Sequence, residues 1–315
     1  MLADEMIGKL ELVREVAPGA SPQRFPDGAH FRIEIPSVEG PRVLEAVLHA
    51  SERHGVTVNR VSQGSGAMLL SRRELREMAE LGAEHGIEVS LFVGPREEYG
   101  VGSYSRSEDG PSCAGQLRAL RQLRYGIEDV ARSVEEGIRS FLVADLGLLD
   151  LLRRLQEERK LPQDLVWKSS VAMAPSNPAS LRVLERLGAS TINIPSDVTL
   201  GQLAEFRSAS DLPLDLYVES PDAMSGVVRG QESAELIWVG APLYVKFGLR
   251  NARSVYPSGE HLEQQAAAMA SEKVHRAAVA MEWLARLDPS LVQSGPGAKG
   301  LGVPALADRS ADGND

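Results

Sequence analysis

Lys246 stands in an apolar stretch, where an unpaired ammonium group would be costly to bury. The stretch APLYVKFGLRN covers residues 241–251, and residues 242–247 alternate in the pattern typical of a strand. Arg250 follows shortly after this strand. Two positive charges at one strand end indicate a site for an anionic ligand.

Polar residues also mark the ends of the other predicted strands. The substrate-binding candidates are Arg32, Glu34, Gln63, Asn193 and Arg250. The catalytic candidates are Glu219, Lys168, Lys246 and Asp145. Because active sites of parallel α/β barrels form at the C-terminal ends of the strands, we expect these residues to share one polar pocket. The alternative for any single residue is an outward-facing position or a satisfied internal ion pair.

Lys168 and Lys246 have two candidate roles. A desolvated lysine near another cation has a lowered pKa, and it can act as a base or form a Schiff base with a carbonyl substrate. Alternatively, each lysine pairs with a carboxylate such as Glu34 or Glu219, or holds an anionic substrate as a fixed charge. In either role we expect the two amines to converge on one pocket with Glu219.

Glu219 is the first candidate for general acid/base catalysis, and Asp145 is the second. Asp215 and Tyr217 precede Glu219 on one face of LDLYVE, and barrel walls can raise the pKa of an enclosed carboxylate toward neutrality. With Glu34, these two carboxylates could also bind Mg²⁺ or Mn²⁺ through oxygen ligands. No cofactor is predicted, and a divalent cation is left open.

Zinc, iron–sulfur and nucleotide sites lack the residues that they need. The six histidines are not paired at metal-ligand spacing, and the single cysteine, Cys113, cannot form a thiolate cluster or an internal disulfide. The sequence contains no dinucleotide fingerprint, phosphate-binding P-loop or serine-nucleophile elbow. The GlySerGly turn at 64–66 is either a phosphate-binding turn or an ordinary connection.

Short apolar runs alternate with helical segments at a spacing of about 25 to 35 residues, as in βα units. The predicted strands are 30–35, 56–61, 88–93, 140–144, 165–171, 191–194, 214–218 and 242–247. The predicted helices between them include 41–53, 71–85, 115–136, 150–158, 180–187 and 200–209. This order predicts a (β/α)8 TIM-type barrel rather than an open sheet.

The barrel is expected to occupy residues 30–257. An N-terminal helix and arm precede it over 1–29, a closing helix follows over 258–287, and a disordered tail is predicted over 288–315. The connection at 94–115 is long, and Tyr99, Tyr104 and Arg106 could bring it over a ligand. A solvated loop is the alternative.

Composition restricts the partners. The net charge of −10 and the pI near 5.3 argue against nucleic acid, which recruits basic surfaces. No segment has the roughly 18 apolar residues of a membrane span, and the acidic N-terminus is unlike a secretory signal. We therefore expect a cytoplasmic protein with a small anionic ligand, and a homo-oligomer is left open.

Residues 137–219 resemble peptidase family U32, the collagenase-like peptidases. The resemblance depends on AspLeuGly at 145–147, LysSerSer at 168–170, Asn177, LeuGly at 187–188 and ThrLeuGlyGlnLeu at 199–203. It implies a barrel and a peptidase-type hydrolase. The family's cysteine cluster is absent here, and GluSerPro stands at 219–221 where the family has His-Gly.

Three functions are compatible with these patterns. The first is an enzyme of lyase or isomerase type that acts on a small anionic carbonyl or hydroxy compound, with Glu219 or Asp145 transferring protons and a lysine assisting. The second, implied by the resemblance alone, is a hydrolase of the U32 peptidase kind. The third is a non-catalytic barrel that serves as a partner subunit.

Overall fold

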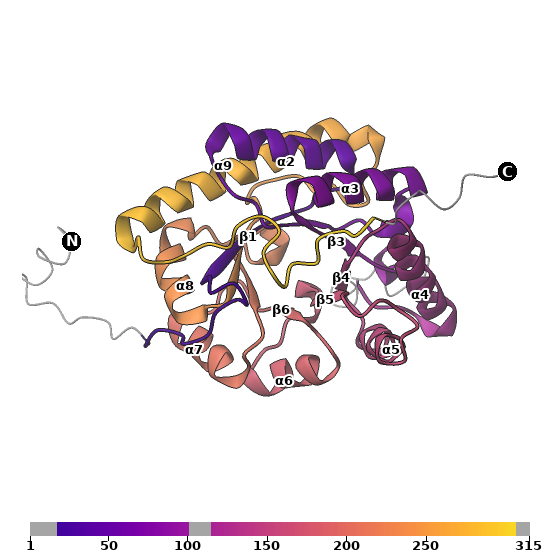
Figure 1. The fold of residues 1–315 in the computed structure, drawn as a ribbon, viewed down its shortest axis with the longest axis horizontal. Helices are drawn as coiled ribbons and strands as arrows, with labels where there is room; N and C mark the ends of the chain where they lie inside the picture. Colours follow the sequence, from indigo (N-terminus) through magenta and orange to yellow (C-terminus); the bar gives the residue numbers. More distant parts are fainter. Residues whose placement is uncertain (1–17, 101–114, 307–315) are drawn as a thin grey trace, which may run out of the picture.

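The protein is an eight-stranded parallel barrel surrounded by helices (Figure 1). A computed structural model describes residues 18–100 and 115–306. Within these ranges the strands are β1 (Phe31–Pro36), β2 (Arg60–Gln63), β3 (Glu88–Phe92), β4 (Ser140–Val143), β5 (Val166–Ser169), β6 (Thr191–Asn193), β7 (Leu214–Glu219) and β8 (Leu243–Phe247). They follow each other around the ring in sequence order, and β8 pairs with β1 to close it. The predicted TIM-type fold is confirmed.

Helices cover the outside of the barrel, as the predicted βα rhythm requires. In the described ranges they are α2 (Pro41–His54), α3 (Arg72–His85), α4 (Ala119–Glu135), α5 (Leu146–Glu157), α6 (Pro178–Arg186), α7 (Leu200–Ala209), α8 (Ser233–Gly240) and α9 (Glu263–Leu287). Local signals fix several ends: Ser71 forms a capping box with Glu74, and Gly55 and Gly86 end α2 and α3 in the left-handed conformation. No helix in the described part of the chain is long and apolar enough to cross a membrane.

α9 is the closing helix, and it packs beside α2 on the outside of the barrel (Figure 1). It begins after a short 3-10 turn, η8 (Glu260–Leu262), so the helical segment starts close to the predicted position. Lys273 of α9 is buried, and its amine donates a 2.7 Å hydrogen bond to the carbonyl oxygen of Pro36. α9 is thereby fixed to the end of β1.

β2 begins later than predicted. Residues 56–59 were expected to open the strand, but the ladder starts at Arg60. The backbone of Asn59 still bonds to Ile33 and Glu88, and its side chain adds further contacts: Oδ1 accepts the backbone N–H of Ile33 at 2.9 Å and Nδ2 donates to the carbonyl of Ser294 at 2.8 Å. Asn59 therefore joins the strand to the C-terminal segment.

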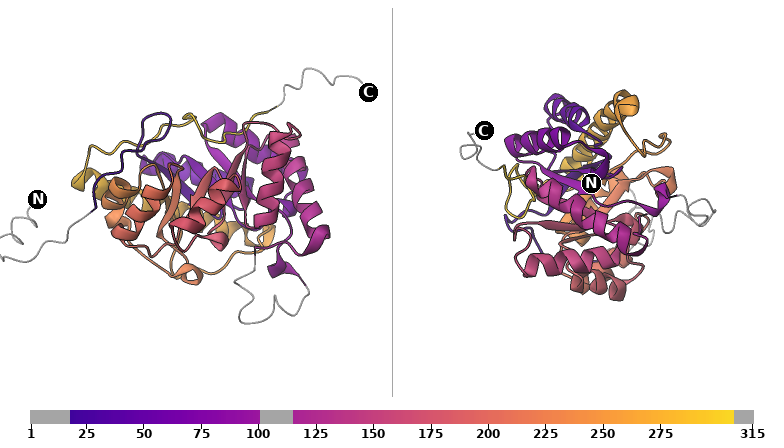
Figure 2. Two further views of the ribbon diagram at one scale, coloured as in Figure 1. Left: turned by 90° about the horizontal axis from the view of Figure 1, so that it is seen from below. Right: turned by 90° about the vertical axis from the view of Figure 1, so that its right-hand side faces the viewer.

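The prediction of disorder for 288–315 is wrong for residues 288–306, which run across the N-terminal end of the barrel (Figures 1 and 2). Backbone hydrogen bonds hold this segment: Ser294 donates to Phe31, Gly297 to Gly86 and Ala305 to Gly137. The many glycines that suggested disorder allow the close backbone approach that these contacts need. We call residues 293–305 the floor segment.

The N-terminal arm meets the floor segment at the same end of the barrel. Phe25 packs edge-on against Tyr244, with ring centroids 5.3 Å apart, and Leu301 packs against the same small cluster. The N–H of Ser21 donates to the carbonyl of Trp238 at 2.8 Å. The helix predicted near the N-terminus lies outside the described residues.

Candidate active site at the mouth of the barrel

The inside of the barrel is filled with charged side chains. Those that are almost completely buried are Arg32, Glu34, Arg60, Glu88, Lys168, Asp215 and Lys246. Barrel interiors are usually packed with branched apolar side chains. Buried charges persist only where they are paired and hydrogen-bonded, so each of these groups needs a specific partner.

Glu34 of β1 lies at the centre of this network. Its Oε2 accepts a hydrogen bond from Arg60 Nε at 2.8 Å and lies 2.6 Å from Nη2 of the same guanidinium in an ion pair. Its Oε1 accepts from the Ser62 hydroxyl at 2.7 Å and from the Lys168 amine. Although burial opposes ionisation, Arg60 and then Lys168 and Lys246 hold the pKa of Glu34 well below its usual range. Glu34 is therefore a fixed negative charge and not an acid/base group near neutral pH.

Arg60 of β2 connects this centre to the opposite wall. Its Nη2 lies 2.5 Å from Asp215 Oδ1 on β7, and its Nη1 lies 3.5 Å from Glu88 Oε1 on β3. The guanidinium also stacks over the Tyr244 ring, with its central carbon 3.4 Å from the ring centroid. Burial opposes its charge, but Asp215 and Glu34 raise the pKa of Arg60 well above its ordinary value.

Lys168 of β5 is fully buried beside Glu34, and its amine lies 4.0 Å from Asp215 Oδ2. Burial and the charge of Arg60 lower the pKa of Lys168 from 10.5 to about 7, although Glu34 and Asp215 favour the charged form. The predicted convergence of the two lysines is therefore real in part. Lys168 approaches Glu34 inside the barrel and does not line the pocket at the mouth.

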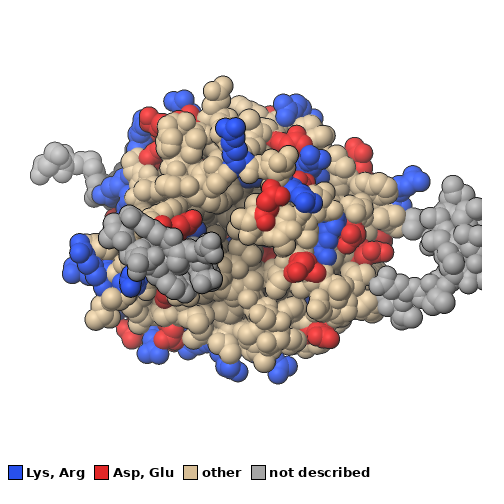
Figure 3. All heavy atoms as spheres, turned by 180° about the vertical axis from the view of Figure 1, so that it is seen from behind, with Lys and Arg blue, Asp and Glu red and all other residues tan. Residues whose placement is uncertain are grey.

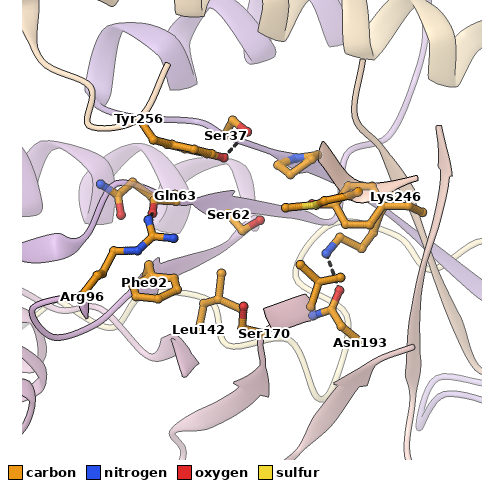
Figure 4. A pocket seen from close by; sticks show the side chains of 15 residues that line it. Ser37, Ser62, Gln63, Phe92, Arg96, Leu142, Ser170, Asn193, Lys246 and Tyr256 are labelled. Carbon is orange, nitrogen blue, oxygen red and sulfur yellow. Dashed lines mark hydrogen bonds between the residues drawn. The ribbon is translucent and has the colours of Figure 1, made fainter. Parts of the chain in front are cut away.

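The mouth of the barrel holds a pocket of about 60 Å³, between the C-terminal ends of the strands (Figure 4). Its polar lining comprises Lys246, Arg96, Asn193, Gln63, Ser37, Ser62, Ser170, Tyr217 and Tyr256, and its apolar lining comprises Pro36, Phe92, Leu142, Val171 and Met224, with Gly64 completing the wall. Among these described residues none is acidic. A pocket with two cations and no carboxylate favours an anionic ligand.

Lys246 of β8 enters this pocket as predicted. Its amine donates a 2.5 Å hydrogen bond to Asn193 Oδ1 (Figure 4). The same amine lies 3.5 Å from Glu34 Oε1. The β7–β8 register places Tyr217 beside Lys246, and the amine is 4.1 Å from the centroid of that ring. Asn193, itself a predicted site residue, is held by a 3.4 Å contact from its Nδ2 to Asp215 Oδ2. The amine is thus positioned at the inner end of the pocket.

Arg96 supplies the second positive charge, and sequence reasoning missed it. It follows β3 and precedes the short turn η2 (Glu97–Tyr99). Its guanidinium stacks over Phe92, 4.3 Å from the ring centroid, and contacts the Tyr99 hydroxyl at 3.3 Å. The available signal was its place just after a predicted strand, within GPREEYG. Of the other residues noted in this connection, Tyr104, Arg106 and Cys113 lie outside the described residues.

Tyr256 closes one side of the pocket from the segment after β8. Its hydroxyl shares a 2.5 Å hydrogen bond with Ser37. A Cβ on Gly64 would lie 2.6 Å from the Tyr256 ring, so a side chain at position 64 would displace it. The GlySerGly turn is not a phosphate site, because the amides of Gly64 and Ser65 each donate a 3.0 Å hydrogen bond to the Glu39 carboxylate. Gln63 lines the pocket, but its amide is bonded to Gly66 in both directions.

Two predicted catalytic residues, Glu219 and Asp145, lie away from the pocket. Glu219 accepts the N–H of Arg250 at 3.2 Å and lies 3.7 Å from Arg276 Nε, because an irregularity between Tyr217 and Glu219 shifts the register of β7. Asp145 caps α5 through the N–H of Leu148 at 2.8 Å. The expected sharing of one pocket by Glu219 and the two lysines is wrong.

Arg250 and Arg32 were predicted to bind the ligand, and neither lines the pocket. The Arg250 side chain is 59% exposed and lies 3.5 Å from Asp222. Arg32 lies at the other end of the barrel, where it donates to Ser294 and Tyr244 at 3.0 Å and to the carbonyl of Lys299 at 2.8 Å. Strand alternation correctly placed Arg32 inside the barrel. Its position along the barrel axis, however, is at the N-terminal end, next to the floor segment.

The carboxylates considered for a divalent cation are not brought together. Glu34 is bonded to Arg60 and Lys168, Asp145 caps a helix and Glu219 faces Arg276. Across the described residues, no group of three or more His, Cys, Asp or Glu side chains is arranged to hold a metal ion. Figure 3 shows one face of the molecule, where the coloured acidic and basic side chains are interspersed without an extended patch of either sign.

Comparison with known proteins gives similarity at the level of solved structures only. No family model and no curated protein matches the chain. A U32 peptidase is 18% identical, with a TM-score of 0.41, over 63% of this chain and 73% of its own. A 2,3-dimethylmalate lyase is 12% identical, with a TM-score of 0.46, over 91% and 88%. A putative fructose-1,6-biphosphate aldolase from Coccidioides immitis is 11% identical, with a TM-score of 0.48, over 82% and 92%. Likenesses this weak do not distinguish peptidase, lyase and aldolase activities.

Proposed function

We propose that this protein is a barrel enzyme of lyase or isomerase type, which binds a small anionic carbonyl or hydroxy compound in the mouth pocket and acts on it with the assistance of Lys246. The observation that carries the proposal is the position of the Lys246 amine. It enters a pocket that also contains Arg96 and has no acidic residue among its described lining.

The ligand's anionic group would lie between the two cations. Arg96 is already oriented by its stacking on Phe92, and its buried Nε has no hydrogen-bond partner among the described residues. Its Nη1 donates to the Gly64 carbonyl and its Nη2 lies 3.3 Å from Glu98 Oε2, whereas Nε is a donor that could serve a carboxylate oxygen of the ligand. The pocket volume of about 60 Å³ accommodates several water molecules or a group of a few heavy atoms, which restricts this part of the ligand to a small one.

A carbonyl carbon next to the anionic group would face the Lys246 amine. Lys246 first gives one proton to the pocket water, and its neutral amine then adds to that carbon. The carbonyl oxygen takes one proton from the amine and one from the pocket water and leaves as water, and the resulting iminium accepts the electron pair of the bond that breaks next to it. Tyr217 lies beside the amine, and burial, together with Glu34, raises the pKa of Tyr217, which keeps its hydroxyl protonated. This hydroxyl can donate a hydrogen bond to the carbonyl oxygen of the ligand, on which negative charge develops as the amine adds.

Borohydride trapping tests this role. The full-length protein is incubated with a panel of small 2-oxo acids and phosphorylated aldehydes and ketones, reduced with borohydride, and weighed by mass spectrometry. We expect one panel member to add its reduced mass to the wild-type protein and none to add to Lys246→Met. Lys273→Met is the matched control, because Lys273 is also a buried lysine but does not line the pocket, and its amine is bonded to the carbonyl of Pro36. This variant should be trapped like the wild type.

The same panel separates the two roles of lysine by calorimetric titration. Binding that is lost in Lys246→Met without any trapping would identify Lys246 as an anion anchor and remove the Schiff-base step. Wild-type affinity in both Lys246→Met and Arg96→Met would contradict the proposed pocket altogether.

A further inference from the structure

One oxygen of the Glu34 carboxylate lies between the buried Lys168 and Lys246, which lines the pocket. Glu34 Oε1 accepts a hydrogen bond from the Lys168 amine and lies 3.5 Å from the Lys246 amine. Lys168 is fully buried, whereas Lys246 lines the pocket. A change of charge in the pocket is therefore transmitted to Lys168 over two short contacts in a region of low dielectric.

The groups that face Lys168 come from every side of the barrel. Glu34 on β1 and Asp215 on β7 favour its charged form, whereas Arg60 on β2 and Lys246 on β8 oppose it. Its neighbours in the ladders of β4 and β6 are uncharged; they are Leu142 and Thr191. On β3, Glu88 lies 3.5 Å from Arg60 and acts on Lys168 through that guanidinium. Lys168 therefore lies between two carboxylates and two cations.

This balance leaves Lys168 ready to change its charge. Its pKa is about 7, so the amine is mostly neutral in the empty protein at pH 8. An anion bound at Lys246 would add a negative charge on the far side of Glu34. A nearby negative charge favours the protonated form of an amine, so the pKa of Lys168 would rise on binding.

We propose that Lys168 is a positioning residue that takes up one proton when an anion binds in the mouth pocket, acting through Glu34 and Lys246. The inference rests on the proposed anion binding at this pocket. The proton comes from solvent and is added to the lone pair of Lys168 Nζ, while Glu34 stays ionised and only transmits the change of charge in the pocket. Release of the anion returns the proton to solvent.

The sign of the pH dependence follows from this exchange. Below pH 7 Lys168 is already protonated, so binding takes up no proton and affinity is highest. As the pH rises above 7 the empty protein loses this proton while the complex retains it, so the dissociation constant rises by up to tenfold per pH unit. The rise ends at the pKa that Lys168 has in the complex.

Calorimetric titration measures this uptake directly. The full-length protein is titrated at pH 8 with sulfate and with oxalate, neither of which titrates near neutral pH, in HEPES and in Tris, which differ in ionisation enthalpy. We expect the wild type to take up a large fraction of one proton. Lys168→Met should bind with no uptake and with an affinity that is constant between pH 6.5 and 8.5. Lys273→Met, which removes another buried lysine with a lowered pKa, should keep the wild-type uptake.

The outcomes separate the two proposals. Anion binding by the wild type without proton uptake overturns the role of Lys168 and leaves the pocket intact, as does unchanged uptake in Lys168→Met. No binding of either anion at any pH overturns the anion site, and the role of Lys168 with it. Should Lys168→Met fail to fold, Lys168→Arg serves instead, because a guanidinium stays protonated throughout this range and the uptake should again disappear.

Discussion

The two ends of the barrel both hold buried or half-buried cations, but they use them differently. At the N-terminal end Arg32 is enclosed by the floor segment and donates to Ser294, Tyr244 and the carbonyl of Lys299. At the C-terminal end Lys246 has one short hydrogen bond, to Asn193, and faces a pocket. The hydrogen-bond donors of Arg32 are therefore used by the chain itself, whereas the Lys246 amine retains donors for a ligand.

The difference shows that the role of a polar residue inside a barrel can be inferred only when the end of the barrel at which it lies is known. Floor residues are covered by the floor segment and the N-terminal arm, which supply hydrogen-bond acceptors and an aromatic surface in Phe25. Such a position contributes to stability. The mouth is formed by the βα connections, where function is expected in this fold.

The largest expected effect is the loss of stability in Arg32→Met. The substitution leaves the buried Tyr244 and Ser294 hydroxyls and the partly buried Lys299 carbonyl without their donor, so we expect the free energy of unfolding to fall by about 3 to 5 kcal/mol. Denaturant unfolding followed by circular dichroism measures it. Arg96→Met at the mouth is the matched variant and should cost less than about 1 kcal/mol. Equal losses in the two variants would abolish the distinction between the ends.

A pH effect of about 3 kcal/mol is expected from Lys273, which lies near the mouth but is satisfied by Pro36 and cannot serve a ligand. Burial lowers the pKa of Lys273 from 10.5 to about 8. Between these two values the unfolded chain binds more protons than the folded chain. Lys273 therefore lowers the free energy of unfolding by its full amount below pH 8, and this destabilisation disappears as the pH rises toward 10.5.

The measurement compares the wild type with Lys273→Met in denaturant at pH 7.5 and at pH 10. The stability of the wild type relative to the variant should rise over this interval. A constant difference would show that Lys273 keeps its ordinary pKa in the folded protein.

Gly302→Ala, where the floor segment crosses the barrel wall, should lower the free energy of unfolding by a smaller amount, about 1 to 2 kcal/mol. A Cβ on Gly302 would lie 2.9 Å from Ser140 Cβ and 3.1 Å from the Arg139 carbonyl, so Gly302→Ala should push the segment outward. Gly295→Ala is the control, because no atom lies within 4 Å of the Cβ that it adds. Thermal unfolding of both variants checks the prediction, which requires a lower Tm only in Gly302→Ala.

The smallest effect concerns Arg250. Because its side chain is 59% exposed and lies beside Asp222, Arg250→Met should change the affinity for oxalate less than twofold. Arg96→Met should weaken the same binding at least tenfold, since it removes a charge from the pocket wall. Calorimetric titration at constant ionic strength distinguishes the two. Equal weakening of oxalate binding in the two variants would show that Arg250 contributes to the binding site.

The sequence by itself determined the barrel. The βα spacing, the glycine stops and the capping residues act within a few residues of one another, so the order of strands and helices was predictable. Strand alternation is equally local, and it indicated that Arg32, Glu34, Lys168 and Lys246 share the inner face. The resemblance to U32 peptidases agreed with the fold and did not add a site.

Only the tertiary structure decided which inner-face residues form the pocket. Alternation gives the side of a strand, but the height of a residue in the barrel depends on how far each strand is staggered against its neighbours. Glu34 pairs in register with Lys246, while Arg32 pairs with Tyr244 one repeat lower and so belongs to the floor. The irregularity in β7 likewise moved Glu219 out of the site. Arg96 and Tyr256 enter the pocket from connections after β3 and β8, and the path of such connections is set by packing across the whole barrel, which no local pattern encodes.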